Sequence, residues 1–488
     1  MSFAILGIVL AAGLGVIATA HVLPIAIALS AGDTAGATAF AVTGILTGFV
    51  AGALIFATRG GQRRAGTEER LVALVFVWAA TPVFGALPFV GANPDMLFVD
   101  AYFDAVSAMT TTGAIPTQYG ETATVAVWRA TLQWIGGFAT LMMAVAVLAP
   151  LGLAGLSLRR APIPPGNTSG PFGRYWPAML TLGLVYGAVT LAGLVGLMMS
   201  GVALIPAMIL AFSAAATGGM AAEPGTSLLG LGLVPAFVLA AMMFVGATGY
   251  HRHAGLVRRS PADYWRDPEF RYAVIGVFGG GFVLAAVIGY DASDVFSLSR
   301  GILWMASLLS TSVHAVDTAG FESIPLLVAL AIVFVGGSTM ATAGGLKLMR
   351  LALLAKQGVR EISRLAHPHG IVHTEFGGRP FTMDVMRGVW ALFVLLLVCA
   401  LVVCGSLTAF GLPFEQAVAA SIGALSNAGP VLGFAPGPDG VALGMGSAEV
   451  YASMPPAAKI ILCLAMIAGR VEILALLGII NSAAIRDS

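Results

Sequence analysis

The chain has 488 residues, of which 58% are hydrophobic and only 10% are charged, and its formal net charge is +1. A soluble domain carries roughly a quarter charged residues, so most of this surface must face something other than water. The composition therefore excludes a soluble globular protein and predicts that a bilayer is the solvent. We expect contacts with membrane lipids and no nucleic-acid partner.

The chain opens with two apolar segments, at residues 3–30 and 36–58. Each is long enough to cross about 30 Å of hydrocarbon as a helix. Because the first segment runs almost directly into the second, we interpret it as a retained helix and not as a cleaved signal peptide. Residues 1–60 are therefore predicted to form two N-terminal transmembrane helices.

A four-fold repeat follows these helices. Its order is an apolar span, a short apolar segment, a stretch that contains glycine, and a second span. The short segments cover residues 102–109, 206–215, 303–316 and 414–425. They are too short to cross a membrane and too apolar for exposed loops, so we expect re-entrant half-helices.

The predicted fold class is an all-α polytopic membrane protein with about ten spans and four re-entrant half-helices. Four tandem repeats of helix, pore helix, filter and helix would surround one pseudo-fourfold pore. The predicted repeats cover residues 61–160, 161–260, 261–365 and 366–488.

The glycines of the four stretches, Gly113, Gly218, Gly320 and Gly429, are 105, 102 and 109 residues apart. Non-helical backbone at membrane depth is tolerated only where it is buried in protein or lines a water-filled cavity, so the stretches should converge on one axis. Rings of backbone carbonyls there can replace the hydration shell of an ion. The alternative is that these glycines serve only close helix packing.

The residues expected in this selectivity filter come from all four stretches. They are Thr111, Thr112, Gly113, Ala216, Thr217, Gly218, Thr318, Ala319, Gly320, Asn427, Ala428 and Gly429.

The apolar span at residues 325–350 is interrupted by glycines and small hydroxyl residues, which predict a broken helix and a gating loop. The gate residues are Gly336, Gly337, Ser338, Thr339, Gly344 and Gly345. A glycine-rich packing face is the alternative interpretation.

Arg470 lies inside the last apolar span, where a charge costs at least about 3 kcal/mol and marks a functional candidate. Glu472 is two positions away on a helix, so the two side chains diverge and cannot simply neutralise each other. Arg470 is predicted either to act in the gate or to form a buried structural pair elsewhere.

Charge predicts the orientation. The linkers at residues 59–70, 158–174, 251–271 and 347–387, with Arg486, hold 20 of the 24 Lys and Arg residues. By the positive-inside bias these linkers and both termini are cytoplasmic. The basic linkers could dock a regulatory subunit or hold anionic lipid headgroups.

Several stretches resemble the TrkH/KtrB/HKT superfamily of potassium transporters, and the resemblance covers essentially the whole chain. The matching stretches are Ser107–Ala114 with Leu132–Gly137, Phe212–Gly219, Gly320–Phe321, Leu425–Pro430, Val335–Lys347 and Gly469–Ile473. The two helices that precede the first repeat favour the TrkH branch.

The resemblance implies potassium uptake across the bacterial cytoplasmic membrane, with K⁺ bound at the filter carbonyls and no cofactor in this chain. It also implies a homodimer in which each subunit has its own pore, and a cytosolic ring of TrkA-like nucleotide-binding regulatory subunits. In the family, a glycine at the position of Gly113 supports potassium selectivity. The arginine that corresponds to Arg470 lies in the pore beneath the filter.

The third repeat departs from the family pattern, because His314 and Asp317 stand where relatives usually have a run of threonines. Asp317 could supply an ion ligand or a proton-sensitive charge. It could equally point behind the filter and accept hydrogen bonds, including one from His314. The departure puts ion selectivity in doubt, and not the fold.

Three classes of function compete: a channel, a carrier and an enzyme. A gated, channel-like potassium pathway is favoured because the repeats share one orientation, whereas carriers typically use inverted pairs. The alternatives within transport are a less selective K⁺/Na⁺ pathway and a symporter coupled to H⁺ or Na⁺. An intramembrane enzyme is disfavoured because His314, Asp317 and Ser426 form no recognisable nucleophile and base motif.

Overall fold

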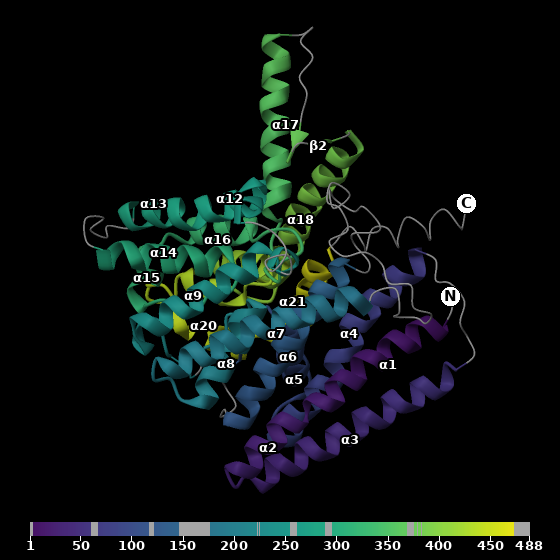
Figure 1. The fold of residues 1–488 in the computed structure, drawn as a ribbon. Helices are drawn as coiled ribbons and strands as arrows, with labels where there is room; N and C mark the ends of the chain where they lie inside the picture. Colours follow the sequence, from purple (N-terminus) through teal and green to yellow (C-terminus); the bar gives the residue numbers. More distant parts are fainter. Residues whose placement is uncertain are drawn as a thin grey trace.

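The computed structural model describes residues 3–59, 67–116, 122–145, 176–221, 223, 225–253, 261–287, 295–367, 375–377, 379–381 and 383–472. The described chain is almost entirely helical (Figure 1). Its one named sheet pairs β1 (Glu375–Phe376) with β2 (Arg379–Pro380) in antiparallel register. The predicted all-α polytopic membrane fold is confirmed.

The N-terminal part matches the two predicted helices. Helix α1 (Phe3–Ala20) continues into α2 (Val22–Ser30), and α3 (Thr34–Ala57) returns beside α1 (Figure 1). The Asp33 carboxylate caps the N-terminus of α3 by accepting a 2.8 Å hydrogen bond from the Gly36 amide.

The four repeats then follow one another in the same order. The first contains α4 (Thr67–Ala92), α5 (Phe98–Met109) and α6 (Ala123–Met143). The second contains α7 (Trp176–Met199), α8 (Leu204–Ala216), η3 (Leu229–Leu231) and α9 (Leu233–Thr248).

The third and fourth repeats are more elaborate. The third is preceded by α10 (Tyr250–His253) and α11 (Pro261–Arg266) and contains α12 (Pro268–Val274), η4 (Ile275–Gly279), α13 (Gly280–Val287), α14 (Val295–Leu309), α15 (Thr318–Ser323), α16 (Leu326–Val335) and α17 (Leu348–Ala366). The fourth contains α18 (Met383–Ala409), α19 (Phe414–Leu425), η5 (Gly429–Phe434), η6 (Gly444–Gly446), α20 (Ser447–Ser453) and α21 (Pro456–Val471). Helix α17 projects from the helical body (Figure 1).

The described helices include six that are long and apolar enough to cross a membrane, or seven if the bent pair α20 and α21 counts as one span. The six are the two N-terminal spans and the first long helix of each repeat. The ten predicted spans would also include the second helix of each repeat. Those helices are shorter or carry buried polar residues, such as Arg129 and Gln133 in α6. Length and apolarity therefore identify the outer helices, while the inner ones pack within the protein.

The inner helices approach the half-helices closely through glycine. A Cβ atom on Gly136 of α6 would lie 1.8 Å from the Met109 carbonyl oxygen, where α5 ends. A Cβ atom on Gly469 of α21 would lie 2.1 Å from the Leu425 carbonyl oxygen, where α19 ends. No larger residue fits at either position without moving the backbone.

The boundaries predicted for the repeats stay predictions. Those near residues 60, 160 and 260 lie outside the described residues, and the boundary at 365 falls at the end of α17.

Candidate ion pathway

Four half-helices, α5, α8, α14 and α19, end inside the protein, and each leads into a short segment of irregular backbone. We name these the turn segments. They are residues 110–114, 216–220, 310–314 and 426–430. The second residue of each segment has a left-handed backbone: φ is 55° at Thr111, 56° at Thr217, 59° at Thr311 and 52° at Asn427. The four segments therefore share a left-handed second residue, while at the fourth position the first three have positive φ and Gly429 begins the 3-10 helix η5.

The turn segments touch one another around a common centre. A Cβ atom on Gly113 would lie 2.0 Å from the Gly218 carbonyl oxygen, and one on Gly219 would lie 1.9 Å from the Ser312 carbonyl oxygen. The Gly429 amide donates a 2.6 Å hydrogen bond to the Thr112 carbonyl oxygen. Backbone from all four repeats thus meets at one place, buried within the fold.

The structure corrects the third repeat. Helix α14 ends at Leu309, so the residues that follow the half-helix are 310–314 and not the predicted Thr318, Ala319 and Gly320. Those three lie in α15, where Thr318 and Ala319 are exposed and Gly320 packs against the Trp304 indole. A Cβ atom on Gly320 would lie 2.1 Å from the indole Nε1 atom, so this glycine serves helix packing.

Val313 occupies the position of a glycine in that segment. Its φ of 51° corresponds to 74° at Gly113 and 71° at Gly219. A β-branched residue rarely adopts this conformation, which persists only where the surroundings impose it. Because this segment contains no glycine, its sequence gives no glycine signal for a filter turn.

The second repeat needs a shift of one residue. Gly219, and not the predicted Gly218, has the left-handed backbone that matches Gly113. Gly218 packs against the side chain of Gln133, whose Nε2 atom donates a 3.1 Å hydrogen bond to the Gly218 carbonyl oxygen. The predicted Ala216 is the last residue of α8, and Thr217 follows it directly.

The fourth segment contains the predicted Asn427, Ala428 and Gly429. Asn427 Nδ2 donates hydrogen bonds to Thr112 Oγ1 at 3.1 Å and to the Met466 carbonyl oxygen at 3.0 Å. Asn427 thereby links the fourth segment to the first. Ala428 is buried beside it, and the Gly429 carbonyl oxygen accepts a 2.8 Å hydrogen bond from the Tyr451 hydroxyl.

Asp317 supports the backbone behind the third segment. Its carboxylate accepts hydrogen bonds from Arg300 Nε at 2.6 Å, from the Gly320 amide at 2.6 Å and from Trp304 Nε1 at 3.4 Å. The supporting interpretation therefore matches the geometry, but the donor is Arg300 where His314 was expected.

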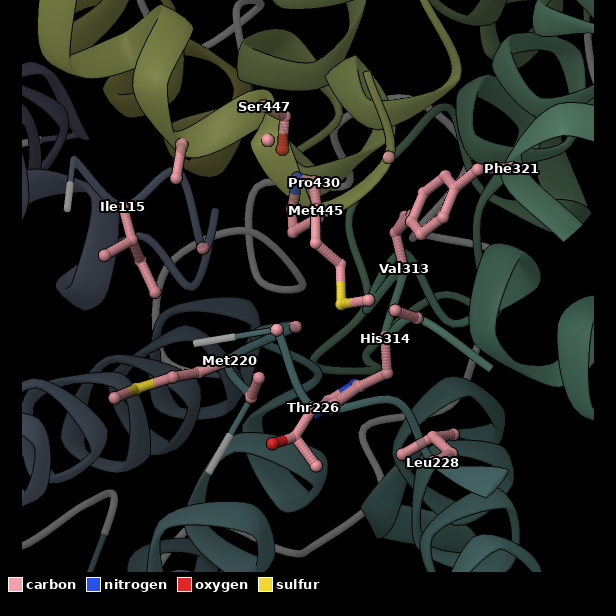
Figure 2. Close-up of a pocket in the computed structure, with 18 of the residues that line it drawn as sticks. Ile115, Met220, Thr226, Leu228, Val313, His314, Phe321, Pro430, Met445 and Ser447 are labelled. Carbon is pink, nitrogen blue, oxygen red and sulfur yellow. The ribbon is translucent and has the colours of Figure 1, made fainter. Parts of the chain in front are cut away.

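A cavity of about 390 Å³ opens against the turn segments, and all four repeats line it. Figure 2 shows Val313, Pro430 and Met445 at this cavity, with His314 extending toward Thr226. His314 is 2% exposed, and its ring nitrogens have no hydrogen-bond partner within the described part of the chain. The place where the turn segments meet therefore opens into this cavity.

The predicted break in the apolar span is present, because residues 336–347 between α16 and α17 are not helical. We name these residues the intramembrane loop. Gly336 and Gly345 have φ values of 68° and 78°, which glycine adopts without strain. Gly337, Ser338, Thr339 and Gly344 are buried in the loop.

The intramembrane loop lies against the turn segments. The Gly344 amide donates a 2.8 Å hydrogen bond to Thr311 Oγ1, and a Cβ atom on Gly344 would lie 1.8 Å from the Ser426 carbonyl oxygen. Thr342 Oγ1 donates a 3.3 Å hydrogen bond to the Gly246 carbonyl oxygen of α9. The loop therefore contacts the third and fourth segments and the inner helix of the second repeat.

Arg470 bridges the loop and a turn segment. The guanidinium donates a 2.8 Å hydrogen bond to the Thr342 carbonyl oxygen and a second one to Thr111 Oγ1. Glu472 forms a 2.6 Å ion pair with Arg350, so the predicted divergence from Arg470 is present, but Glu472 follows the end of α21 with a φ of 60° and does not lie on the helix. A 3% exposed cation thus sits between the loop and the first turn segment.

Sequence reasoning missed several residues of this site. They are Gly219, Thr311 and Val313. The run Ser310-Thr311-Ser312 could have indicated the third segment, because it follows its half-helix directly, as Thr110-Thr111-Thr112 does.

Comparisons with known proteins agree with this architecture. Residues 36–483 match the TrkH family, described as a cation transport protein. The chain is 31% identical over 470 residues to the Trk system potassium uptake protein TrkH of Salmonella typhimurium, covering 93% of this chain and 94% of that protein. It is 29% identical over 468 residues to the protein of the same name from Escherichia coli.

A solved structure gives the same result. The crystal structure of the potassium transporter TrkH from Vibrio parahaemolyticus superposes with a TM-score of 0.83 at 25% identity and covers 98% of each chain. With the family match over residues 36–483, these likenesses show that the chain belongs to the TrkH family of cation transport proteins.

Proposed function

We propose that this protein carries potassium ions across the bacterial cytoplasmic membrane through a gated, channel-like selectivity filter. The observation that carries the proposal is the meeting of four left-handed turns, each at the end of a buried half-helix. The carboxyl end of each half-helix carries a partial negative charge that favours a cation at the centre. Relatives with this fold are named potassium uptake proteins.

The proposed filter consists of backbone from the four turn segments. It comprises Thr111, Thr112, Gly113, Thr217, Gly218, Gly219, Thr311, Ser312, Val313, Asn427, Ala428 and Gly429. Carbonyl oxygens in these turns would replace the water molecules around K⁺. The transported ion is the only small-molecule partner in the proposal, and the chain is not proposed to be an enzyme.

The intramembrane loop and Arg470 form the proposed gate. Arg470 places a positive charge next to Thr111, so it would repel a cation that leaves the filter. The loop contacts the third and fourth turn segments, so a displacement of the loop would clear the path and move the partner of Arg470 at Thr342. Flux would then depend on the position of the loop.

We include three further elements in the proposal. The protein forms a homodimer with one pore in each subunit, and a TrkA-like nucleotide-binding ring regulates it from the cytosol. Both termini are cytoplasmic, and the basic linkers at residues 251–271 and 347–387 face the ring or anionic lipid headgroups. The word system in the names of the relatives is consistent with more than one component.

A less selective K⁺/Na⁺ pathway is the second candidate, and Val313 is the observation that favours it. Three of the four turn segments place glycine where Val313 stands in the third. A side chain at that position changes how the four turns pack and thus the size of the ion site. A symporter coupled to H⁺ or Na⁺ has no comparable observation in its favour.

The test is ion flux in liposomes that contain the purified protein, with K⁺, Rb⁺, Na⁺ and Li⁺ compared. We expect passive flux that favours K⁺ and Rb⁺ and that rises roughly tenfold in Arg470→Ala, because a charge beside the path costs about 1.4 kcal/mol or more. Arg364→Ala, on the exposed part of α17, is the matched control and should leave the flux unchanged. Flux that requires an imposed H⁺ or Na⁺ gradient would replace the channel with a symporter.

A further inference from the structure

Glu269 is a fully buried carboxylate that the proposed pathway does not use. It lies in α12, close to the cytoplasmic end of the third repeat, and its exposed fraction is 0%. Oε1 accepts hydrogen bonds from the Thr339 amide at 3.0 Å and from Thr339 Oγ1 at 2.6 Å. A single carboxylate oxygen therefore holds both donors of one residue in the intramembrane loop.

The other oxygen faces a cation. Glu269 Oε2 accepts a 2.5 Å hydrogen bond from Arg252 Nη2 in α10. Arg252 also forms a 2.9 Å ion pair with Asp267 and lies 3.5 Å from Ser338 Oγ in the loop. The Asp267 side chain caps the N-terminus of α12 by accepting a hydrogen bond from the Glu269 amide. The loop, α10 and α12 are thus joined by one network of charged groups.

The intramembrane loop lies between this network and the turn segments. On one side the loop contacts Arg470 and the turn segments through Thr342 and Gly344. On the other side the loop residue Thr339 contacts Glu269. Glu269 lies in the linker at residues 251–271, which holds five arginines. A buried carboxylate whose cation moves away is left with an uncompensated charge, which is strongly unfavourable. Movement of α10 relative to α12 would therefore change the contact between Glu269 and Thr339 of the loop.

We propose that Glu269 is a positioning residue that holds the intramembrane loop against the turn segments, and that Arg252 couples this hold to the linker at residues 251–271. The inference rests on the proposed gate and adds its cytoplasmic control point. A partner that pulls on the linker separates Arg252 from Glu269, releases Thr339 and raises ion flux. A partner that leaves the linker in place keeps the flux low.

The first experiment measures K⁺ flux in liposomes for Glu269→Gln, with Glu361→Gln on the exposed surface of α17 as the matched control. We expect flux to rise about tenfold in Glu269→Gln, because the neutral amide no longer gives Thr339 a charged hydrogen-bond acceptor. The control should not change. Thr339→Val removes only the hydroxyl donor, so a smaller rise of about threefold is expected.

The second measurement reports the position of the loop and not ion movement. Met340→Cys places a thiol in the loop at a site that is 5% exposed, in a background where Cys399, Cys404 and Cys463 are replaced by alanine. Its labelling by a water-soluble maleimide should speed up when Glu269→Gln or Arg252→Gln is added. Arg252→Lys retains a cation and should restore slow labelling.

The outcomes separate this inference from the proposed gate. If Arg470→Ala raises flux while Glu269→Gln and Thr339→Val change neither flux nor labelling, the positioning role is wrong and the gate stands. If labelling speeds up but flux does not, the loop is held by Glu269 but is not a gate. Should Glu269→Gln fail to fold, Thr339→Val and Arg252→Lys decide the same question.

Discussion

The first and third repeats build the same turn from different residues. The first uses Thr111 and Gly113, and the third uses Thr311 and Val313, with left-handed backbone at both pairs of positions. Their supports differ too. The half-helix α5 is held by two buried ion pairs, Asp104 with Arg129 and Asp100 with Lys459, each at 2.7 Å.

The third repeat relies on a more accessible pair. Arg300 and Asp317 are joined at 2.6 Å, but their side chains are 21% and 14% exposed. The comparison teaches that backbone shape at the ion path is shared among repeats, while the energy that holds it comes from different contacts. Three predictions sharpen this comparison.

The largest effect is expected at the buried pair of the first repeat. Arg129→Met leaves the Asp104 carboxylate buried without its principal cation, which typically costs about 3–5 kcal/mol. Arg300→Met, its counterpart in the third repeat, should cost about 1 kcal/mol because water reaches that pair. The measurement is the free energy of unfolding in mixed detergent micelles.

A double variant tests whether the lost pair is the cause. Arg129→Met with Asp104→Leu removes both charges and should regain most of the stability. Equal losses for Arg129→Met and Arg300→Met would mean that the two supports are equivalent and that the contrast between the repeats is wrong.

The second prediction exchanges glycine and valine between the two turns. Gly113→Val places a Cβ atom 2.0 Å from the Gly218 carbonyl oxygen, so the backbone must shift. Such a shift costs about 1–3 kcal/mol, which corresponds to a loss of K⁺ flux of up to about 100-fold. Val313→Gly relieves a rare conformation and should preserve flux while changing the K⁺ to Na⁺ ratio about threefold.

Flux of the four alkali ions through both variants provides the measurement, with the amount of folded protein checked by size-exclusion chromatography. If Gly113→Val conducts normally, the first turn does not need glycine. If Val313→Gly leaves the ion preference unchanged, the valine has no part in selectivity and the less selective pathway loses its support.

The smallest effect concerns α10, in the linker that precedes the third repeat. Burial, followed by the positive charge of Arg252, lowers the pKa of His253 from 6.5 to about 4. The unfolded chain therefore binds more protons between these values, and stability is complete above pH 6.5 and falls as the pH drops toward 4. At pH 5 the loss amounts to about 2 kcal/mol, from about 1.4 kcal/mol for each pH unit.

Unfolding measured at pH 7 and pH 5 tests this dependence. His253→Phe keeps a ring beside Tyr250 and Tyr264 and removes the titration, so its stability should change less with pH. His367→Phe, at the exposed end of α17, is the control and should behave as the unaltered protein does. An identical pH dependence in all three proteins would assign the effect to other groups.

Much of the architecture follows from the sequence because its signals are local. The half-helix at residues 414–425 is bounded by Pro413 and by a polar stretch, and the structure reproduces its limits in α19. The break at Gly336 also follows from composition, since glycines and hydroxyls interrupt an apolar span. Arg470 can be identified from the sequence as a functional candidate, because a charge within an apolar span must have partners.

The third turn segment and the partners of Asp317 depend on the tertiary structure. Val313 has a left-handed backbone although it is β-branched, and Gly320 lies in α15 against the indole of Trp304. Glu269 contacts Thr339, which is 70 residues away along the chain, so its role depends on the tertiary structure. The sequence by itself determined the repeats, the half-helices and the broken helix, because short-range apolarity and glycine encode them. Tertiary structure decided which residues form the third turn and which charges hold the loop, because those choices depend on packing between repeats.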